Sequence, residues 1–284
     1  MKSSIKLFDY YLPDRLIATQ PRTRREQAKL MVYDNQNDNL QHSTFSNLYN
    51  FLNEGDLLIL NDTKVLPGRL FLKKESGGNV EILFHKFISN LSIQCIFKSS
   101  RKIAINSKLF INEKSFFIVE KVEKNYITLS CKVNPMKYFT SFGEVPLPKY
   151  IKREATIDDK NRYQTVYARK DGSVAAPTAG LHFTNRILSE LQDKGVQIDY
   201  LTLHVTYNTF KPISNDDYKI HDIGSESCSI DKSLMLKIRD TKKNDKKVYA
   251  VGTTVTRALE DYASKEYTES FSGEADLYIT PGYE

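Results

Sequence analysis

The stretch SVAAPTAGLHFT, Ser173 to Thr184, followed by NRILSELQDK (185–194), decides the fold of this chain. Residues 174–176 are small and apolar, and they predict the end of a strand. Thr184 is an N-cap residue type, apolar residues recur after it at helical spacing, and Gly195 is placed to end the helix. A strand, a tight loop and a helix in succession are the repeating unit of an α/β fold.

The loop inside this stretch is the first candidate site. Pro177 fixes φ and removes a backbone donor, and Gly180 permits a positive φ or a close backbone approach. His182 titrates near neutral pH and stands just before the expected helix. Small-residue loops that lead into a helix N-terminus favour polar or anionic ligands. A tight structural turn with a satisfied histidine explains the same residues, so the loop alone leaves both interpretations open.

Strands and helices alternate on both sides of this loop. DLLIL (56–60) is a continuous apolar run that predicts a buried strand ending at Asn61-Asp62. Further along, strands are expected at QIDYLTLHV (197–205), KVYAVG (247–252) and ADLYITP (275–281). Helices are expected at KSLMLKIRDT (232–241), capped by Asp231, and at VTRALEDYASK (255–265), with Thr253-Thr254 as the preceding turn.

Between about residues 70 and 145 the pattern changes. The runs VEILFHK (80–86), SIQCIFK (92–98), KSFFIVEKV (114–122) and NYITLSCKV (125–133) are short and rich in β-branched and aromatic residues. Several strands at short spacing favour a sandwich or barrel. We therefore expect a discontinuous α/β domain, residues 1–68 plus 150–284, interrupted by an inserted all-β, barrel-like domain, residues 69–149.

Composition limits the function classes. No apolar run approaches 18 residues and no secretory h-region follows Met1, so we expect a cytoplasmic protein that does not contact membrane. The three cysteines form no CxxC pair, and neither HExxH, GxGxxG, GxxxxGK[ST] nor GxSxG occurs. These absences disfavour a metal site, a dinucleotide fold and a P-loop ATPase. The formal charge of +6 is compatible with binding of a polyanion, and equally with a charged surface that only keeps the protein in solution.

Polar residues cluster at four expected strand ends. A strand end is a common place for a site in α/β proteins, although ordinary caps and turns use the same residue types. The clusters are Asn61-Asp62-Thr63 with Arg69; Arg162, Tyr163, Gln164, Thr165 and Tyr167; Thr178 with His182; and Gly252-Thr253-Thr254 with Arg257. His204 ends a further strand, where a structural role is the plainer interpretation.

These residues lie in segments that resemble the S-adenosylmethionine:tRNA ribosyltransferase-isomerase family of queuosine biosynthesis. The matching segments include FDYYLPDRLIATQPRTRREQAKLMV (8–32), GDLLILNDTKVLPGRL (55–70), GEVPLPKYIKR (143–153), DDKNRYQTVYARKDGSVAAPTAGLHFT (158–184), VYAVGTTVTRALE (248–260) and DLYITPGYE (276–284). They run in family order from residue 8 to the last residue, and the QTVYA…AAPTAGLHFT segment is highly specific.

The resemblance implies an α/β domain interrupted by a β-barrel-like domain. It implies transfer and isomerisation of the ribosyl group of S-adenosylmethionine onto 7-aminomethyl-7-deazaguanine in tRNA, giving epoxyqueuosine-tRNA, adenine and methionine. S-adenosylmethionine is then a co-substrate, no metal or further cofactor is implied, and we expect a monomer whose partner is the tRNA.

The resemblance implies roles for the candidate residues. Acid and base candidates are His182, His204 and Asp62. Thr253 and Thr254 are placed to hold the methionine carboxylate, Tyr163 and Tyr167 to stack on a base, and Arg69, Arg162 and the arginines at 22–25 to contact tRNA phosphates. The remaining candidate substrate contacts are Asn61, Thr63, Thr165, Pro177, Thr178, Ala179, Gly180, Phe183 and Arg257.

The chain departs from the family pattern at several positions. Thr206, Tyr207 and Asn208 stand where the family usually has Gly-x-Gly, Gly224 replaces a histidine, and Glu274 stands where tryptophan is usual. The family also continues for tens of residues beyond the PGYE at which this chain stops. Three hypotheses follow: a ribosyltransferase-isomerase, a catalytically silent tRNA- or nucleotide-binding relative, or a paralogue that acts on another nucleoside.

Overall fold

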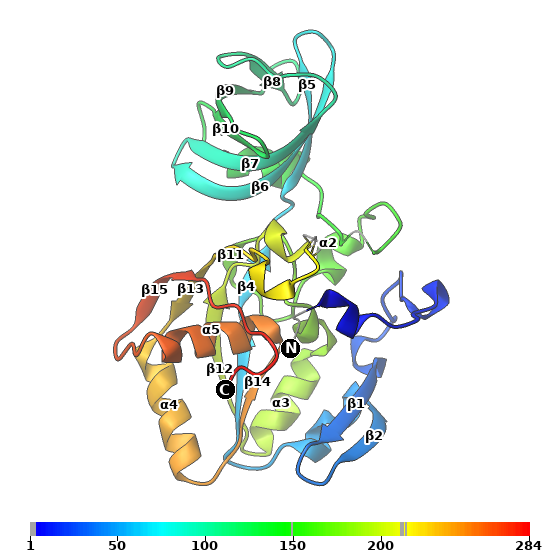
Figure 1. Cartoon of the computed structure of the whole chain (residues 1–284), viewed down its shortest axis with the longest axis vertical. Helices are drawn as coiled ribbons and strands as arrows, with labels where there is room; N and C mark the ends of the chain where they lie inside the picture. The colour runs from blue at the N-terminus through cyan, green and yellow to red at the C-terminus, as the bar shows by residue number, and fades with distance from the viewer. Residues whose placement is uncertain (1–3, 149, 211–212, 214) are drawn as a thin grey trace.

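The computed structural model describes residues 4–148, 150–210, 213 and 215–284. It has two lobes, a small β-barrel above and a larger α/β body below, joined by a narrow connection (Figure 1). The strands are β1 (Lys29–Asp34), β2 (Asn39–Thr44), β3 (Leu57–Asn61), β4 (Thr63–Val65), β5 (Arg69–Lys74), β6 (Asn79–Ser89), β7 (Ser92–Ser99), β8 (Lys108–Phe110), β9 (Phe116–Val122), β10 (Tyr126–Ser130), β11 (Lys170–Ser173), β12 (Gln197–Leu203), β13 (Glu226–Ile230), β14 (Val248–Ala250) and β15 (Phe271–Ala275).

The α-helices are α1 (Met136–Phe142), α2 (Asp159–Arg162), α3 (Asn185–Asp193), α4 (Lys232–Lys243) and α5 (Thr253–Ser264). Short 3-10 helices are η1 (Ile5–Phe8), η2 (Asp14–Leu16), η3 (Arg25–Gln27), η4 (Phe45–Phe51), η5 (Thr178–His182), η6 (Tyr207–Phe210) and η7 (Tyr218–Ile220). In the described part of the chain, no helix combines the length and apolar character needed to cross a bilayer.

The body is built on a mixed five-stranded sheet of order β14-β3-β12-β13-β15. β14, β3 and β12 are parallel, and β13 and β15 join antiparallel. β3 is buried along its whole length because both of its faces are covered. Leu58 and Leu60 share a core with α3 and η4, whereas Leu57 and Ile59 share one with α4 and α5. The continuous apolar run is thus the signature of a central strand, as predicted.

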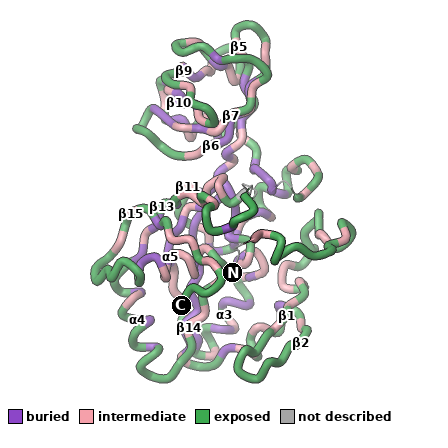
Figure 2. The backbone as a smooth tube through the Cα atoms, viewed as in Figure 1, coloured by how far each residue is buried: buried purple, intermediate pink, exposed green. Residues whose placement is uncertain are grey.

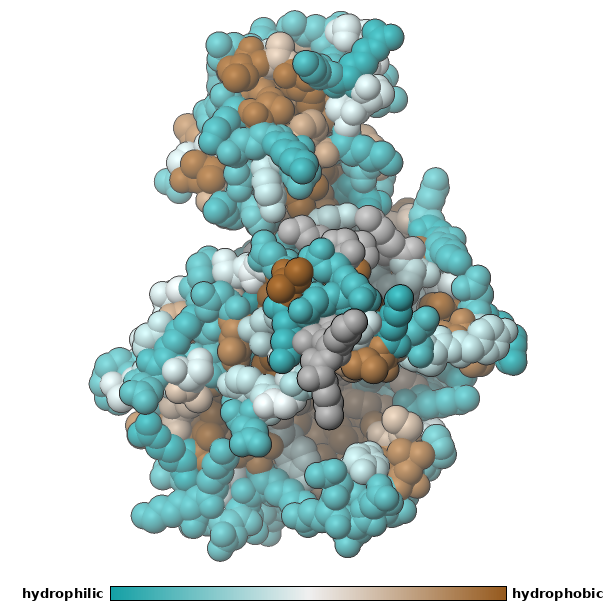
Figure 3. Space-filling model, in the orientation of Figure 1, coloured by the Kyte–Doolittle hydropathy of each residue, from teal (hydrophilic) through white to brown (hydrophobic). Residues whose placement is uncertain are grey.

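The six strands β5 to β10 close into a barrel of order β10-β7-β6-β5-β8-β9. Alternate residues of these strands, among them Leu70, Ile82 and Phe117, are almost fully buried and belong to one core cluster. Figure 2 shows buried segments along the strands of the upper lobe. Apolar side chains such as Phe71 and Phe87 also reach the barrel surface, where brown patches appear on the upper lobe (Figure 3). The expected fold class, α/β with a barrel-like insertion, is confirmed. The boundaries 1–68, 69–149 and 150–284 stay a prediction, with the barrel strands running from Arg69 to Ser130.

The deciding stretch forms a strand, a tight loop and a helix. The Thr184 side chain accepts a hydrogen bond from the backbone N–H of Ile187 and caps α3, and Gly195 follows the helix with φ +89°. The strand ends earlier than expected, because β11 stops at Ser173 and residues 174–176 are buried outside it.

Two expectations near the C-terminus are wrong. Thr253 and Thr254 are the first residues of α5, and Gly252 with φ +87° is the N-cap. ADLYITP is not a strand, since β15 covers residues 271–275 and ends where that run begins. The physical reason is that Asp261 Oδ1 accepts the backbone N–H groups of both Asp276 and Leu277, so side chains take the hydrogen bonds that a neighbouring strand would make.

Candidate functional site

Asn61 joins the ends of β3 and β12. Its Oδ1 accepts from the N–H of Leu203, and its Nδ2 donates to the Leu203 carbonyl, both near 3 Å. The buried amide therefore makes the equivalent of one more pair of ladder hydrogen bonds at the last residue of β3. Nδ2 also lies 3.3 Å from Thr254 Oγ1, which ties the sheet to the start of α5. Asn61 holds the scaffold through these contacts.

Asp62 is a buried carboxylate with two partners. Thr202 Oγ1 donates to Oδ1 at 2.6 Å, and Arg169 Nη2 lies 3.1 Å from Oδ2. The Arg169 guanidinium also stacks over the Tyr200 ring at 4.2 Å. Arg169 was not among the sequence candidates, although a cation two residues after the candidate Tyr167 was the available signal.

Thr63 and His204 belong to a second chain of hydrogen bonds beside Asp62, in which His204 is partly buried. Thr63 Oγ1 lies 2.8 Å from His204 Nδ1 and 2.7 Å from Ser173 Oγ. Ser173 Oγ in turn accepts from the N–H of Val205 at 2.8 Å. Burial lowers the pKa of His204 more than the nearby Asp62 raises it. The structure thus brings together Asn61, Asp62, Thr63 and His204 at one end of the sheet.

A cavity of about 400 Å³ lies between the N-terminal segment, the residues before α2 and η5. His182, Thr178, Tyr163 and Arg162 line it, as do Tyr150 and several cations from the early arginine run. This volume falls in the range of small-ligand sites. Burial lowers the pKa of His182 more than its backbone hydrogen bond with Arg25 raises it, and the Arg25 cation also lowers it.

The arginines around this cavity are engaged in holding its walls. Arg25 donates to the carbonyls of Gln164 and Leu181, and Arg162 donates to those of Arg22 and Thr23. Arg153 and Asp159 form a bidentate pair on the same rim, with the guanidinium lowering the pKa of the carboxyl far below its usual range. Neither member of that pair was a sequence candidate. Arg25, Arg153 and Arg162 all line the cavity and give it positive charge, although the hydrogen bonds of these arginines are made to other protein groups.

Four further candidates, Thr165, Tyr167, Gly180 and Phe183, pack together within and beneath the 177–184 loop. Tyr167 and Phe183 pack edge to face with ring centroids 6.2 Å apart, and Thr165 is equally buried. A Cβ on Gly180 would overlap the Tyr167 hydroxyl, so glycine is required here for close approach, and its φ is not positive. Tyr167 is a core residue in this arrangement, with a second ring contact to Tyr200.

The remaining loop residues connect η5 to the start of α5. Pro177 precedes η5 as its N-cap, and Ala179 lies against Gly252, where a Cβ would come within 3.1 Å of the alanine methyl. Thr253 is exposed at the first turn of α5. Contacts therefore run from Asn61 through α5 to η5 and Tyr167, yet the cavity that His182 lines does not include Asn61, Tyr167 or Thr253.

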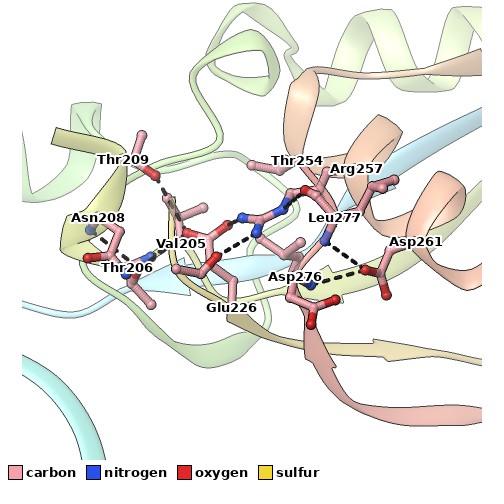
Figure 4. A network of polar contacts seen from close by, with 12 residues as sticks. Val205, Thr206, Asn208, Thr209, Glu226, Thr254, Arg257, Asp261, Asp276 and Leu277 are labelled. Atoms are coloured by element: carbon pink, nitrogen blue, oxygen red, sulfur yellow. Dashed lines mark hydrogen bonds and ion pairs between the residues drawn. The ribbon is translucent and has the colours of Figure 1, made fainter. Parts of the chain in front are cut away.

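Arg257, on α5, is partly buried and belongs to a polar network with Glu226 of β13 (Figure 4). It bonds Glu226 Oε2 at 3.0 Å and the carbonyls of Gly224 and Leu277. Glu226 Oε1 accepts from the N–H of Thr206 at 2.8 Å, so the pair ties the segment after β12 to α5 and to the end of β15. Burial raises the pKa of Glu226 despite the Arg257 cation. All of these contacts are within the protein.

Two departures from the family pattern meet in this network. Gly224 has φ +67°, and a Cβ there would overlap the side-chain nitrogen of Asn208. The side chain at 208 therefore occupies space that the absence of one at 224 provides. Thr206 contributes its N–H to Glu226. The substituted loop is packed, although the buried side-chain oxygen of Asn208 has no hydrogen-bond partner among the described residues.

Arg69 lies away from the other candidates. It lines a second cavity of about 420 Å³ between the barrel and residues 146–147, and it pairs with Glu81 at 3.3 Å. Among the described residues, no group of three or more His, Cys, Asp or Glu side chains is arranged to hold a metal ion.

Comparison with known proteins gives one consistent result. A family model described as queuosine biosynthesis protein matches residues 5–284. A relative from Hydrogenobaculum sp., named S-adenosylmethionine:tRNA ribosyltransferase-isomerase, is 44% identical over 98% of this chain and 81% of its own length. The relative of the same name from Halothermothrix orenii is 40% identical over 98% and 83%. A crystal structure of the S-adenosylmethionine tRNA ribosyltransferase from Thermotoga maritima matches with 27% identity and a TM-score of 0.50, over 98% of this chain and 80% of that one.

Proposed function

Because the chain belongs to the queuosine biosynthesis protein family, we propose that it is an S-adenosylmethionine:tRNA ribosyltransferase-isomerase. The ribosyl group of S-adenosylmethionine passes to 7-aminomethyl-7-deazaguanine in tRNA and is isomerised there, while adenine and methionine leave. The observation that carries this proposal is the match of nearly the whole chain, at about 40% identity, to relatives that bear this name. The silent-relative hypothesis is not favoured by these matches.

We place the reacting part of the substrates in the cavity beside His182. The cavity is large enough for a nucleoside, and it combines the rings of Tyr150 and Tyr163 with cationic walls. Rings stack on bases, and cations suit the phosphates next to a nucleobase. S-adenosylmethionine is a co-substrate in this proposal, and the tRNA is the partner.

His182 is the acid–base group that this placement favours. Departure of adenine is helped by proton donation, and attack by the aminomethyl nitrogen requires that it lose a proton. A neutral imidazole accepts a proton, and burial, which lowers the pKa of His182, favours the neutral form. Activity should then fall as the pH drops through a value below 6.5, since the imidazolium cannot accept a proton.

The test uses the full chain, S-adenosylmethionine and tRNA that carries the deazaguanine precursor. We expect release of adenine and methionine with formation of epoxyqueuosine-tRNA, followed by chromatography and nucleoside mass spectrometry. Binding of the tRNA without adenine release would overturn the proposal.

A matched pair of variants tests the placement. His182→Ala should lower turnover by about 10²–10⁴-fold, the usual contribution of a positioned acid–base group. His42→Ala, at an exposed position in β2, is the control and should leave turnover unchanged. Equal turnover in both variants would remove His182 from the reaction.

A further inference from the structure

The hydroxyls of Thr63 and Ser173 lie in a line that ends at the ring of His204. Both side chains are fully buried, with no exposed area. Starting from the N–H of Val205, the chain of contacts runs to Ser173 Oγ at 2.8 Å, to Thr63 Oγ1 at 2.7 Å and to His204 Nδ1 at 2.8 Å. Because the two hydroxyls are out of reach of water, each hydroxyl proton needs an acceptor within the protein.

Counting donors and acceptors shows in which direction the hydrogen bonds of this chain run. If Ser173 donates to Thr63 and Thr63 donates to Nδ1, every hydroxyl proton has an acceptor. In the opposite direction Nδ1 donates to Thr63 and Thr63 to Ser173, whose oxygen already accepts from Val205. The Ser173 proton then has no acceptor among the described residues, in a place without solvent. An unmet buried donor is the costly alternative.

The geometry points to a fixed neutral tautomer of His204, with its proton on Nε2 and its Nδ1 lone pair held by the Thr63–Ser173 hydroxyl pair. Thr63 and Ser173 are then positioning residues for the ring. Gly172 completes the support, since a Cβ there would come within 2.6 Å of the ring atoms Cε1 and Nδ1.

The surrounding charges do not reverse this assignment. Burial is the largest influence and lowers the pKa of His204, and Lys170 acts in the same sense. Asp62 and Asp171 act in the opposite sense, but each is paired with a cation, Arg169 and Lys64 respectively. Protonation of Nδ1 would also force the hydroxyl line into its unfavourable direction.

This tautomer changes the role that sequence analysis gave to His204. A ring whose Nδ1 accepts from Thr63 and whose Nε2 carries the proton offers a hydrogen-bond donor and no free lone pair. His204 can therefore donate a hydrogen bond through Nε2, and it has no free lone pair with which to act as a general base. This consequence for the reaction rests on the proposed function, whereas the tautomer itself rests on the network alone.

Nitrogen-15 NMR of the histidine-labelled full chain tests the tautomer directly. The chain has five histidines, and the difference spectrum of His204→Gln assigns the signals of residue 204. Between pH 6 and 8 we expect an unprotonated type of shift at Nδ1 and a protonated type at Nε2. A proton on Nδ1, or a charged ring at pH 7, would overturn the inference.

Two substitutions of Thr63 test whether the hydroxyl line is the cause. Thr63→Val keeps the shape and removes the hydroxyl, so the tautomers should become mixed. Thr63→Ser keeps the hydroxyl and should keep the wild-type pattern. An unchanged tautomer in Thr63→Val would show that the line does not fix the ring. If that variant does not fold, the wild-type spectrum still decides the tautomer.

Turnover then separates this inference from the proposed function. The amide nitrogen of glutamine can replace an Nε2 donor, so His204→Gln should retain at least about tenfold more activity than His204→Ala, the effect of one hydrogen bond of about 1.4 kcal/mol. Equal loss in both variants would overturn the donor role. Absence of adenine release in the wild type would overturn the proposed function and leave the NMR result standing.

Discussion

The barrel and the α/β body bury different kinds of side chain. Within the barrel strands β5 to β10, Ser92 and Thr128 are the buried polar residues among those described. At the strand ends of the body, Asn61, Asp62 and Glu226 are buried together with threonines and Ser173. The barrel is therefore held by packing, whereas the body carries a polar network whose members must all be satisfied. The difference marks the body as the lobe that holds the candidate chemistry.

The barrel interior should lose the most stability from a single truncation. Phe117 is fully buried and packs against Tyr138 and Phe139. We expect Phe117→Ala to lower the free energy of unfolding by about 3–5 kcal/mol, because it leaves a cavity in a packed core. Urea unfolding should give the same loss at pH 5 and pH 8, since no charge is involved. Phe71→Ala, at an exposed barrel position, is the control and should change stability by less than about 0.5 kcal/mol.

A comparable change in the body should depend on pH. Arg257→Met leaves the buried Glu226 carboxylate without its cation, and we expect a loss of about 3 kcal/mol at pH 8. Burial already raises the pKa of Glu226 above 4.5, and loss of the cation raises it further. The folded state then holds a proton that the unfolded state has released, so the loss grows as the pH rises above about 4.5 and is smaller at pH 5.

The double variant Arg257→Met with Glu226→Gln is the control for that result, because it removes the charge that was left unpaired. It should recover stability at pH 8 and lose the pH dependence. A loss independent of pH in Arg257→Met alone would show that packing, and not the charge, makes Arg257 important.

Filling the close contact at Gly180 should lower the free energy of unfolding by less than Phe117→Ala or Arg257→Met. Gly180→Ala places a methyl group where the Tyr167 hydroxyl lies, and we expect a loss of about 1–3 kcal/mol from overpacking. Tyr167→Phe removes that oxygen, so the double variant should be more stable than the sum of the two single changes predicts, measured by thermal or urea unfolding. If the two stability changes simply add in the double variant, the methyl group at 180 and the Tyr167 hydroxyl do not collide.

The pair formed by Gly224 and Asn208 gives an effect of similar size that can be divided into two parts. Gly224→Ala meets both a positive φ of +67° and the Asn208 side chain, and we expect a loss of about 2 kcal/mol. Adding Asn208→Ala removes the steric part and leaves the backbone part, about 1 kcal/mol. Calorimetric melting of the three variants separates the two contributions. If Asn208→Ala restores nothing, the side chain at 208 is not what excludes a Cβ at 224.

The elements that sequence predicted well are those whose pattern is local. The run at 56–60 is buried on both faces, and the residue types around Thr184 are sufficient for a capped helix. The run ADLYITP was misassigned because its hydrogen bonds go to Asp261, a residue on a helix that no strand pattern reveals. The same limit applies to the site. Asn61 and Arg257 have binding residue types, yet their polar atoms are taken by partners distant in sequence.

The smallest expected effect concerns the cap of α3, in the stretch that sets the fold. Thr184 Oγ1 accepts from the N–H of Ile187 at 3.2 Å, so Thr184→Ala removes one hydrogen bond at a helix end and should cost about 1 kcal/mol. Asp231 stands at the corresponding place before α4 but makes no side-chain cap bond, so Asp231→Ala should cost less. Urea unfolding of the two variants side by side measures the difference. Equal losses would mean that the cap bond itself contributes little and that the loop before α3 is held by the packing of η5.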